Sequence, residues 1–203
     1  MNELATFVRL GFLHITDLNA VDHILFLLAL AAIYRVSDWR DVLRVITAFT
    51  VGHSITLVLV SLDMLRLPQA LVEFLIPVTI VATCIENIAV RDHRAALWGG
   101  RYRPVFAGIF GLVHGAGFAS YLQNLSMGDI VLPLFGFNLG IELGQVVILA
   151  VTFGALLCVD RMLVAIRRAP DGNTWSPVRT RAVAMSAVIL FIAAAWAVQR
   201  SPW

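Results

Sequence analysis

The amino-acid sequence predicts an all-α protein, a polytopic bundle of transmembrane helices, and two observations support this prediction. Hydrophobic residues make up 60% of the 203 residues and charged residues only 14%, whereas soluble domains have about 25% charged residues. Several apolar runs also reach or approach the ~20 residues that a helix needs to cross a bilayer. The sequence shows no internal repeat and no second region of different composition, so we expect one membrane domain over 1–203.

The first expected element is a short N-terminal helix within 2–18, a less apolar segment that carries Arg9, His14 and Asp17. We expect it to lie at the interface or to re-enter the membrane, packed against the bundle. About six spanning helices should follow, because the rest of the chain is divided into long apolar runs. They are expected near residues 20–35, 42–62, 69–90, 104–124, 131–160 and 182–199.

The segments between these runs support the boundaries. "WGGRYRP" (98–104) is typical of a turn, and Pro104 suits the first position of the fourth spanning helix. The fifth run is longer than a bilayer requires, so we expect its helix to tilt or to extend beyond the membrane. "APDGNTWSP" (169–177) is dense in Pro, Gly and Asn and predicts a loop. The sixth run has almost no polar side chain, so its helix should lie at the edge of the bundle.

Every one of the fifteen basic residues is an arginine, and twelve of them flank or occupy the first, third and fifth connections. Cytoplasmic loops of membrane proteins carry such an excess of positive charge. We therefore expect these connections in the cytoplasm and both termini outside, in the inner membrane of a bacterium. The three arginines expected on the outer side are Arg9, Arg66 and Arg200.

Ionisable and strongly polar side chains occur within five of the six expected spans. A charged residue at the centre of a spanning helix costs roughly 2.5–3.5 kcal/mol, so such residues are candidates for function. The candidate metal ligands are His14, Asp22, His23, His53, His114 and Glu142. The candidate supporting polar residues are Asp17, Ser54, Glu86, Asn87, Asn138 and Gln145.

The positions of these candidates along their helices predict a ladder across the membrane rather than a single site. His53, His114 and Glu142 fall near the middle of their spans, whereas Asp22 and His23 fall near the outer end of the first span. Adjacent residues on a helix point about 100° apart, so Asp22 and His23 cannot both face one ion. We expect His23 to be the ligand, with Asp22 either orienting an imidazole or capping the helix.

Glycines at i, i+4 spacing occur in "GIFGLVHGAG" (108–117) and "GFNLGIELG" (136–144). In a membrane, this spacing lets helix backbones approach closely. These faces could pack helices within the chain and clear room around His114 and Glu142, or they could meet a second copy or another membrane protein. The lipid bilayer is the other expected partner, and the net charge of +2 gives no indication of nucleic-acid binding.

The combination of imidazoles and carboxylates suits a first-row divalent metal ion such as nickel, zinc or cobalt. Oxygen-only sites would instead favour magnesium or calcium, and thiolates would favour Cu(I). Ligating imidazoles must be unprotonated, so occupancy should fall as the pH drops through the histidine range. A divalent metal ion is therefore the expected bound species.

Four stretches carry a resemblance to a known family: "GFLHITDLNAVDHILFLLAL", "ITAFTVGHSITL", "FGLVHGAGFA" and "FNLGIELGQ". Together they resemble the HupE/UreJ family of small integral-membrane proteins. That resemblance implies a permease for nickel or a related divalent metal, of the kind that accompanies hydrogenase and urease maturation. By the same resemblance, His14, Asp22 and His23 match the first motif, His53 the second and His114 the third. Seven residues separate His14 from Asp22, against five in the hydrogenase-associated branch.

Three functions follow from these features, and transport is the first. A divalent cation would enter near Asp22 and His23 and pass His53, His114 and Glu142. The second is an intramembrane metal-dependent hydrolase, in which zinc-bound water is the nucleophile and its histidines converge on one ion. The third is a non-catalytic assembly subunit, which the glycine-rich faces would suit. A transporter is favoured over an enzyme, and the sequence has no ATP-binding P-loop, so transport would be passive, ion-coupled or driven by a partner.

Overall fold

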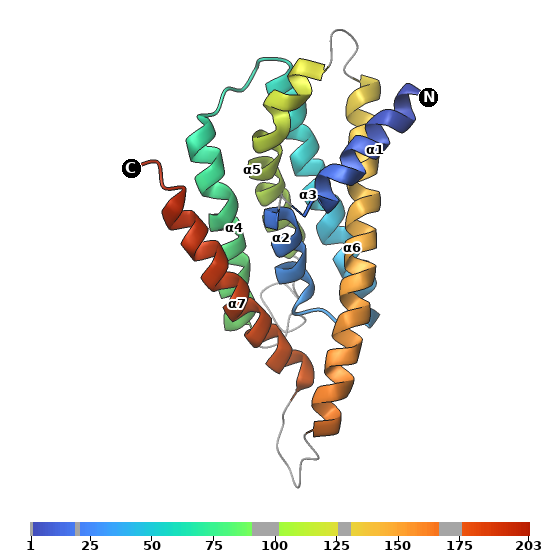
Figure 1. Cartoon of the computed structure of the whole chain (residues 1–203), viewed down its shortest axis with the longest axis vertical. Coiled ribbons are helices and arrows are strands. Elements are labelled where there is room, and N and C mark those ends of the chain that lie inside the picture. The colour runs from blue at the N-terminus through green and yellow to red at the C-terminus, as the bar shows by residue number, and fades with distance from the viewer. Residues whose placement is uncertain (1, 19–20, 91–101, 126–130, 167–175) are drawn as a thin grey trace.

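The computed structural model describes residues 2–18, 21–90, 102–125, 131–166 and 176–203 (Figure 1), with side chains of the fifth α-helix described as far as residue 117. Within these ranges the regular elements are all helical, so the all-α prediction is confirmed. The elements in order are α1 (Glu3–Thr16), α2 (Val21–Ala31), the 3-10 turn η1 (Val36–Asp38), α3 (Trp39–Ser61), α4 (Gln69–Ala89), α5 (Tyr102–Leu125), α6 (Val131–Ile166) and α7 (Pro177–Gln199).

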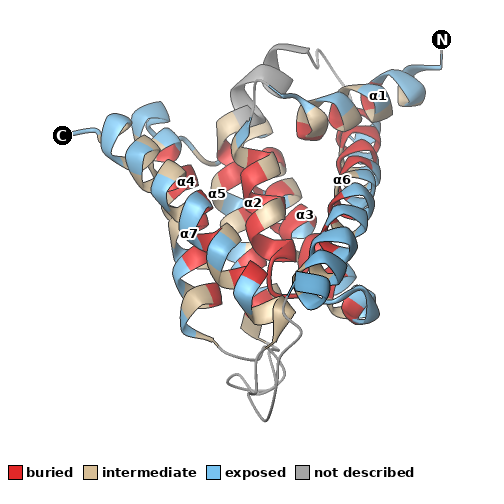
Figure 2. Cartoon of the chain, turned by 60° about the horizontal axis from the view of Figure 1, so that its bottom comes forward, coloured by how far each residue is buried: buried red, intermediate tan, exposed pale blue. Residues whose placement is uncertain are grey.

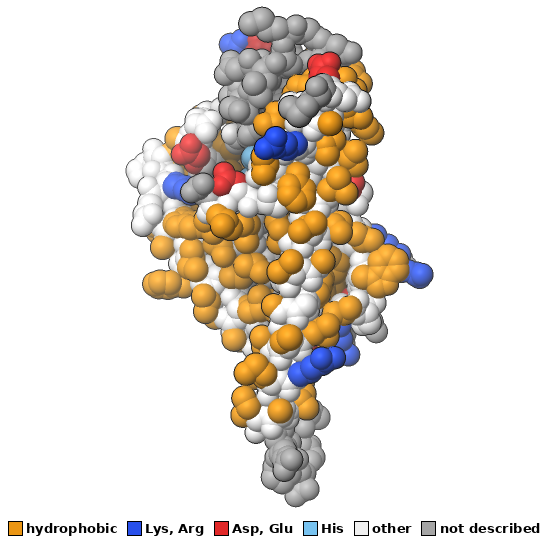
Figure 3. Space-filling model, turned by 45° about the vertical axis from the view of Figure 1, so that its right-hand side comes forward, with side chains coloured by type: hydrophobic (Ala, Val, Ile, Leu, Met, Phe, Trp, Pro, Cys, Tyr) orange, Lys and Arg blue, Asp and Glu red, His pale blue; other side chains and the backbone are white. Residues whose placement is uncertain are grey.

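Four segments of the described chain are long and apolar enough to cross a membrane: Val36–Ser61, α4, α6 and α7. A fifth would be formed by α1 and α2 together, which are bent by 71° at their junction. The chain is thus a membrane protein, but the expected count of six spans is not confirmed. Hydrophobic side chains cover most of the face in view in Figure 3, and the acidic side chains in view lie mainly in its upper part.

The expected first span over 20–35 differs most from the structure. The N-terminal helix ends at Thr16 because Asp17 has an extended backbone, and α2 then covers only 11 residues. At about 1.5 Å per residue, such a helix spans roughly half of a bilayer core. Four residues after its end, the backbone N–H of Arg35 donates to Asp38 at 2.9 Å and caps the 3-10 turn that follows. In Figure 1, α2 begins near mid-height and runs toward the lower end.

The helices are held together by close backbone contacts at glycines. An added Cβ at Gly140 of α6 would collide with the carbonyl oxygen of Val8 on α1, and one at Gly111 of α5 would collide with that of Phe49 on α3. The close approach predicted for these glycines is therefore present, and it joins α1 to α6 and α3 to α5 within the chain. Contact with a second chain through the same helices stays a prediction.

These pairs surround α2, which is the most buried helix (Figure 2). The α1–α6 pair lies on one side of it, and α7 packs against α4 on the other, at the edge of the bundle as predicted. The helix ends that flank the arginine-rich connections all lie at the lower end in Figure 1, while the two chain termini lie in the upper half. The helices thus alternate in direction as the predicted topology requires.

Candidate metal centre

The junction between α1 and α2 determines where the first three candidate ligands lie. His14 is in the last turn of α1, and Asp22 and His23 are in the first turn of α2. The two helix ends lie close together near mid-height of the molecule in Figure 1, where Leu18 is 80% exposed and His23 is 9% exposed. The carbonyl end of a helix carries partial negative charge, and broken helices in transporters use such ends to bind cations near the membrane midplane.

Four histidines from four helices converge at this junction. The ring centroids of His14 and His23 are 4.7 Å apart, those of His14 and His53 are 6.3 Å apart, and those of His23 and His114 are 5.5 Å apart. The predicted ladder is therefore wrong for the histidines. The ladder requires His23 to lie near the outer end of a full-length span. In the structure, α2 instead starts at the depth of His53 and His114.

Two of these imidazoles are buried and have ring nitrogens that make no hydrogen bond to the part of the chain that the structure describes. His53 is 1% exposed, and neither of its ring nitrogens has a hydrogen-bond partner among the described residues. His114 is 2% exposed, and its Nδ1 likewise has none within the described part of the chain. A buried polar group without a partner costs about 1–3 kcal/mol. Both side chains are thus available to a ligand that supplies the missing interaction.

The hydrogen bonds of Thr79 determine the tautomer of His114. The Thr79 hydroxyl donates to the carbonyl oxygen of Ile76 at 2.7 Å, and its oxygen lies 3.0 Å from Nε2 of His114. Because the hydroxyl hydrogen is already used, Nε2–H must be the donor in the second contact. Nδ1 then carries the lone pair, as in metal-binding histidines whose other nitrogen donates to an oxygen.

The ring nitrogens are close together without forming a finished coordination sphere. Among the described side chains, no group of three or more His, Cys, Asp or Glu residues is arranged to hold a metal ion as it stands. Metal–imidazole bonds are about 2.0–2.1 Å long, so the rings would have to rotate to bind one ion together. An adjustable site of this kind suits a cation that passes through better than one that is held permanently.

A cavity of about 390 Å³ connects the histidines with the surface. His14, His23 and His114 line its inner part, and the exposed Glu73 of α4 lies on its wall. Asp22 also lines it and accepts a hydrogen bond of 3.0 Å from Arg200, the residue that follows α7. The cavity therefore combines imidazoles with two carboxylates.

Aromatic rings close the site on the side opposite this cavity. Phe26 stacks on Phe49 with ring centroids 4.9 Å apart, and its ring centroid is 5.4 Å from that of His114 and 6.3 Å from that of Phe110. Phe26 and Phe49 are 2% and 1% exposed. They separate the histidines from a second cavity deeper along α2.

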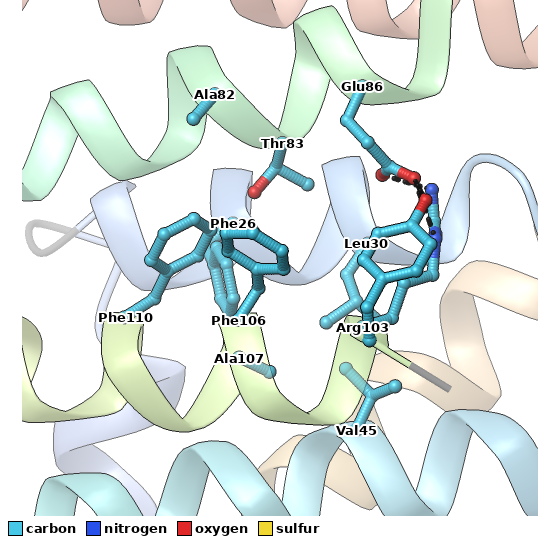
Figure 4. A pocket seen from close by; sticks show the side chains of 11 residues that line it. Phe26, Leu30, Val45, Ala82, Thr83, Glu86, Arg103, Phe106, Ala107 and Phe110 are labelled. Carbon is cyan, nitrogen blue, oxygen red and sulfur yellow. Dashed lines mark hydrogen bonds and ion pairs between the residues drawn. The ribbon is translucent and has the colours of Figure 1, made fainter. Parts of the chain in front are cut away.

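This second cavity has a volume of about 180 Å³ and is lined by residues of α2, α3, α4 and α5 (Figure 4). Glu86 lies at one end of it, where Arg103 and the hydroxyl of Tyr102 both donate to the carboxylate. Arg103 also donates to Asn87 at 2.9 Å, and the amide of Asn87 donates to the carbonyl oxygen of Ala29 at 2.6 Å. The predicted supporting residues Glu86 and Asn87 thus belong to a paired cluster away from the histidines.

The structure does not bring Glu142 to the histidines. Its carboxylate accepts a hydrogen bond of 3.1 Å from Thr47 of α3, and one turn further Thr50 donates to Gln145 at 3.0 Å. Asn138 donates to the carbonyl oxygen of Leu134 in its own helix. These three predicted residues form polar contacts along α6 that are separate from the histidine cluster.

Two further predicted polar residues have local roles. Ser54 donates to the carbonyl oxygen of Thr50 at 2.7 Å, as expected for a hydroxyl within a helix. Asp17 is the residue that ends α1.

Several residues of the site, among them Phe26, Thr79 and Arg200, do not stand out as site residues in the sequence. Phe26 lies in an apolar run, so nothing marked it out from its neighbours. Thr79 resembles any threonine that bonds to its own helix, although it follows a proline inside α4. Arg200 was considered only for topology. The sequence predicts both Arg200 and Asp22 on the outer side of the membrane, and this shared location could have indicated an ion pair between them.

A family model described as HupE / UreJ protein matches residues 1–200. No curated protein and no solved structure matches the chain.

Proposed function

We propose that this chain, which belongs to the HupE/UreJ family, transports a divalent transition-metal cation, nickel or a similar ion, across the membrane. The observation that supports this most is the cavity of about 390 Å³ that leads from the surface to clustered imidazoles at a helix break. The cation is the substrate here, and the histidines are its transient ligands.

The path of the cation follows the gradient of burial. Asp22 and His14 are partly exposed and meet the cation first, while His53 and His114 are deeply buried and complete its coordination. Replacement of hydration water by imidazole suits nickel, cobalt and zinc better than magnesium or calcium. The lone pair at Nδ1 of His114 is oriented for this by Thr79.

The two cavities would open to opposite sides of the membrane. The arginine excess assigns the lower helix ends in Figure 1 to the cytoplasm, so the histidine cavity would face outward and the Glu86 cavity inward. Phe26 and Phe49 lie between them and would have to move before the cation could pass. The membrane would be the inner membrane of a bacterium, as the sequence analysis predicts.

Uptake of Ni²⁺ by proteoliposomes that contain the purified protein tests this proposal. The double variant His53→Ala, His114→Ala should lose at least about tenfold in uptake, because it removes two ligands from the deepest part of the path. The matched control is His93→Ala, which replaces the one histidine that is not a candidate ligand. His93 lies outside the described residues, and this variant should behave as the wild type. Equal uptake by all three proteins would overturn the proposal.

The same uptake should depend on pH in a defined direction. Imidazoles bind metal only when unprotonated, and the ordinary pKa of histidine is about 6.5. Uptake should therefore be high at pH 7.5 and should fall as external protons compete for the histidines near pH 5.5. An uptake rate that rises with acidity would instead indicate that protons drive the cation across.

A metal-dependent hydrolase is a second candidate, because such an enzyme also needs histidines that lie close together, as they do here. Such an enzyme would hold zinc as a resident ion and would use zinc-bound water as the nucleophile, with Asp22 as base. Metal analysis of the purified protein distinguishes the two. One tightly held zinc per chain, with no Ni²⁺ uptake, would favour the hydrolase.

A further inference from the structure

The wall of the cavity that contains the histidines also carries a positively charged side chain, that of Arg200. Arg200 lies directly after α7, and its guanidinium donates to the carboxylate of Asp22 at 3.0 Å. Asp22 is one of the two carboxylates on the cavity wall, together with Glu73. The guanidinium of Arg200 is thus paired with the Asp22 carboxylate, which an incoming metal ion would meet near the histidines.

Arg200 is held in this position from two directions. Its backbone N–H donates to the carbonyl oxygen of Trp196 at 2.9 Å, which closes the last turn of α7. Its guanidinium carbon lies 5.3 Å from the centre of the Trp196 ring, within the range of a cation–π interaction. The side chain is nevertheless 34% exposed. The contact with Asp22 is only partly buried, so the guanidinium can leave the carboxylate for water.

We propose that Arg200 is a tethered competitor that holds Asp22 when the site is empty and is displaced by a divalent cation as the cation enters. This inference rests on the proposed transport function. A guanidinium carries one positive charge and a metal ion two, so a divalent cation can win the exchange where a monovalent cation gains little over Arg200. Arg200 would thereby favour divalent over monovalent cations at the site. Its competition for Asp22 would also weaken the binding of the metal ion enough for the ion to be released.

The displaced guanidinium has an alternative anion close by. Glu73 lines the same cavity, and its carboxylate is engaged by the neutral amide of Gln69 at 2.9 Å. A charged donor forms a stronger hydrogen bond with a carboxylate than an amide does. Arg200 can therefore exchange Asp22 for Glu73, which keeps both arginine and metal ion paired within one cavity.

Titration calorimetry of the purified full-length protein with NiCl2 tests the proposal. The variant Arg200→Gln should bind Ni²⁺ about fivefold more tightly than the wild type, the change expected when a partly exposed ion pair no longer competes. Arg200→Lys keeps the charge and should remain within about twofold of the wild type. The matched control is Arg66→Gln, whose arginine is paired with Asp63 at 2.5 Å in the connection before α4 and does not line the cavity. Its affinity should not change.

A double-mutant cycle identifies the group for which Arg200 competes. In an Asp22→Asn background, Arg200→Gln should change the affinity by less than about twofold, because the shared carboxylate is gone. If Arg200→Gln does not fold, Trp196→Leu keeps the arginine, removes its aromatic support and should raise the affinity by about twofold. Equal or weaker Ni²⁺ binding by whichever of these single variants folds would overturn the proposal and leave the transport function standing. A wild-type protein that binds no Ni²⁺ would overturn both.

Discussion

The two polar clusters inside this membrane protein differ in how completely their atoms are paired. In the cluster around Glu86, the carboxylate, the guanidinium of Arg103 and the amide of Asn87 all have partners on neighbouring helices. In the histidine cluster, both nitrogens of His53 and one of His114 have no hydrogen bond among the described residues. Polar groups in lipid are costly in both cases, but only the second cluster leaves that cost uncompensated. The difference favours a structural role for the first cluster and supports the proposed role of the second in binding a cation.

The largest expected effect concerns stability and the paired cluster. Arg103→Met leaves the Asn87 oxygen without its donor and the Glu86 carboxylate with Tyr102 but without its cation, and breaking a buried pair from one side costs about 3–5 kcal/mol. We expect a loss of this size in the free energy of unfolding, measured by denaturant titration in detergent. The double variant Arg103→Met, Glu86→Gln should recover part of it. A stability change below about 1 kcal/mol in the single variant would remove the distinction between the clusters.

An intermediate effect is expected at the boundary of the histidine cluster. Thr79→Val removes the oxygen that accepts Nε2–H of His114, so the imidazole can adopt the wrong tautomer. Such positioning contacts affect metal affinity by about 10–100-fold. The Ni²⁺ affinity of this variant should fall within that range, whereas Thr83→Val, one turn further on α4 where the hydroxyl donates to Thr79, should be neutral. Comparable losses in both variants would show that the hydroxyls matter only for packing.

The smallest expected change in stability is at Glu142. Glu142→Gln preserves an oxygen that can accept the Thr47 hydrogen bond, so the free energy of unfolding should stay within about 0.5 kcal/mol of the wild-type value. If the carboxylate carries cation or protons after the histidines, Ni²⁺ uptake should still fall several-fold while Ni²⁺ affinity is unchanged. Unchanged uptake would limit Glu142 to a contact between α3 and α6.

Much of the architecture was predictable because it depends on local composition. The apolar runs indicate helices, and the structure places α3, α4, α6 and α7 in or near the expected ranges. The glycine spacing predicts close helix contacts, and Gly111 and Gly140 make them. The partners of those glycines were not predictable, because the spacing of one helix does not say which other helix it faces.

The candidate site was predictable in its residue types and not in its geometry. The sequence alone identified a membrane protein, the four histidines and Asp22, since isolated polar residues stand out in apolar runs. Only the tertiary structure decided that the histidines meet. Hydropathy measures the length of an apolar run and not the depth in the bundle at which its helix starts. The expected boundary before residue 20 is present, but α2 ends at Ala31 and spans only about half of a bilayer core. His23, at its start, therefore lies beside His14 and His114 instead of at the outer end of a full span.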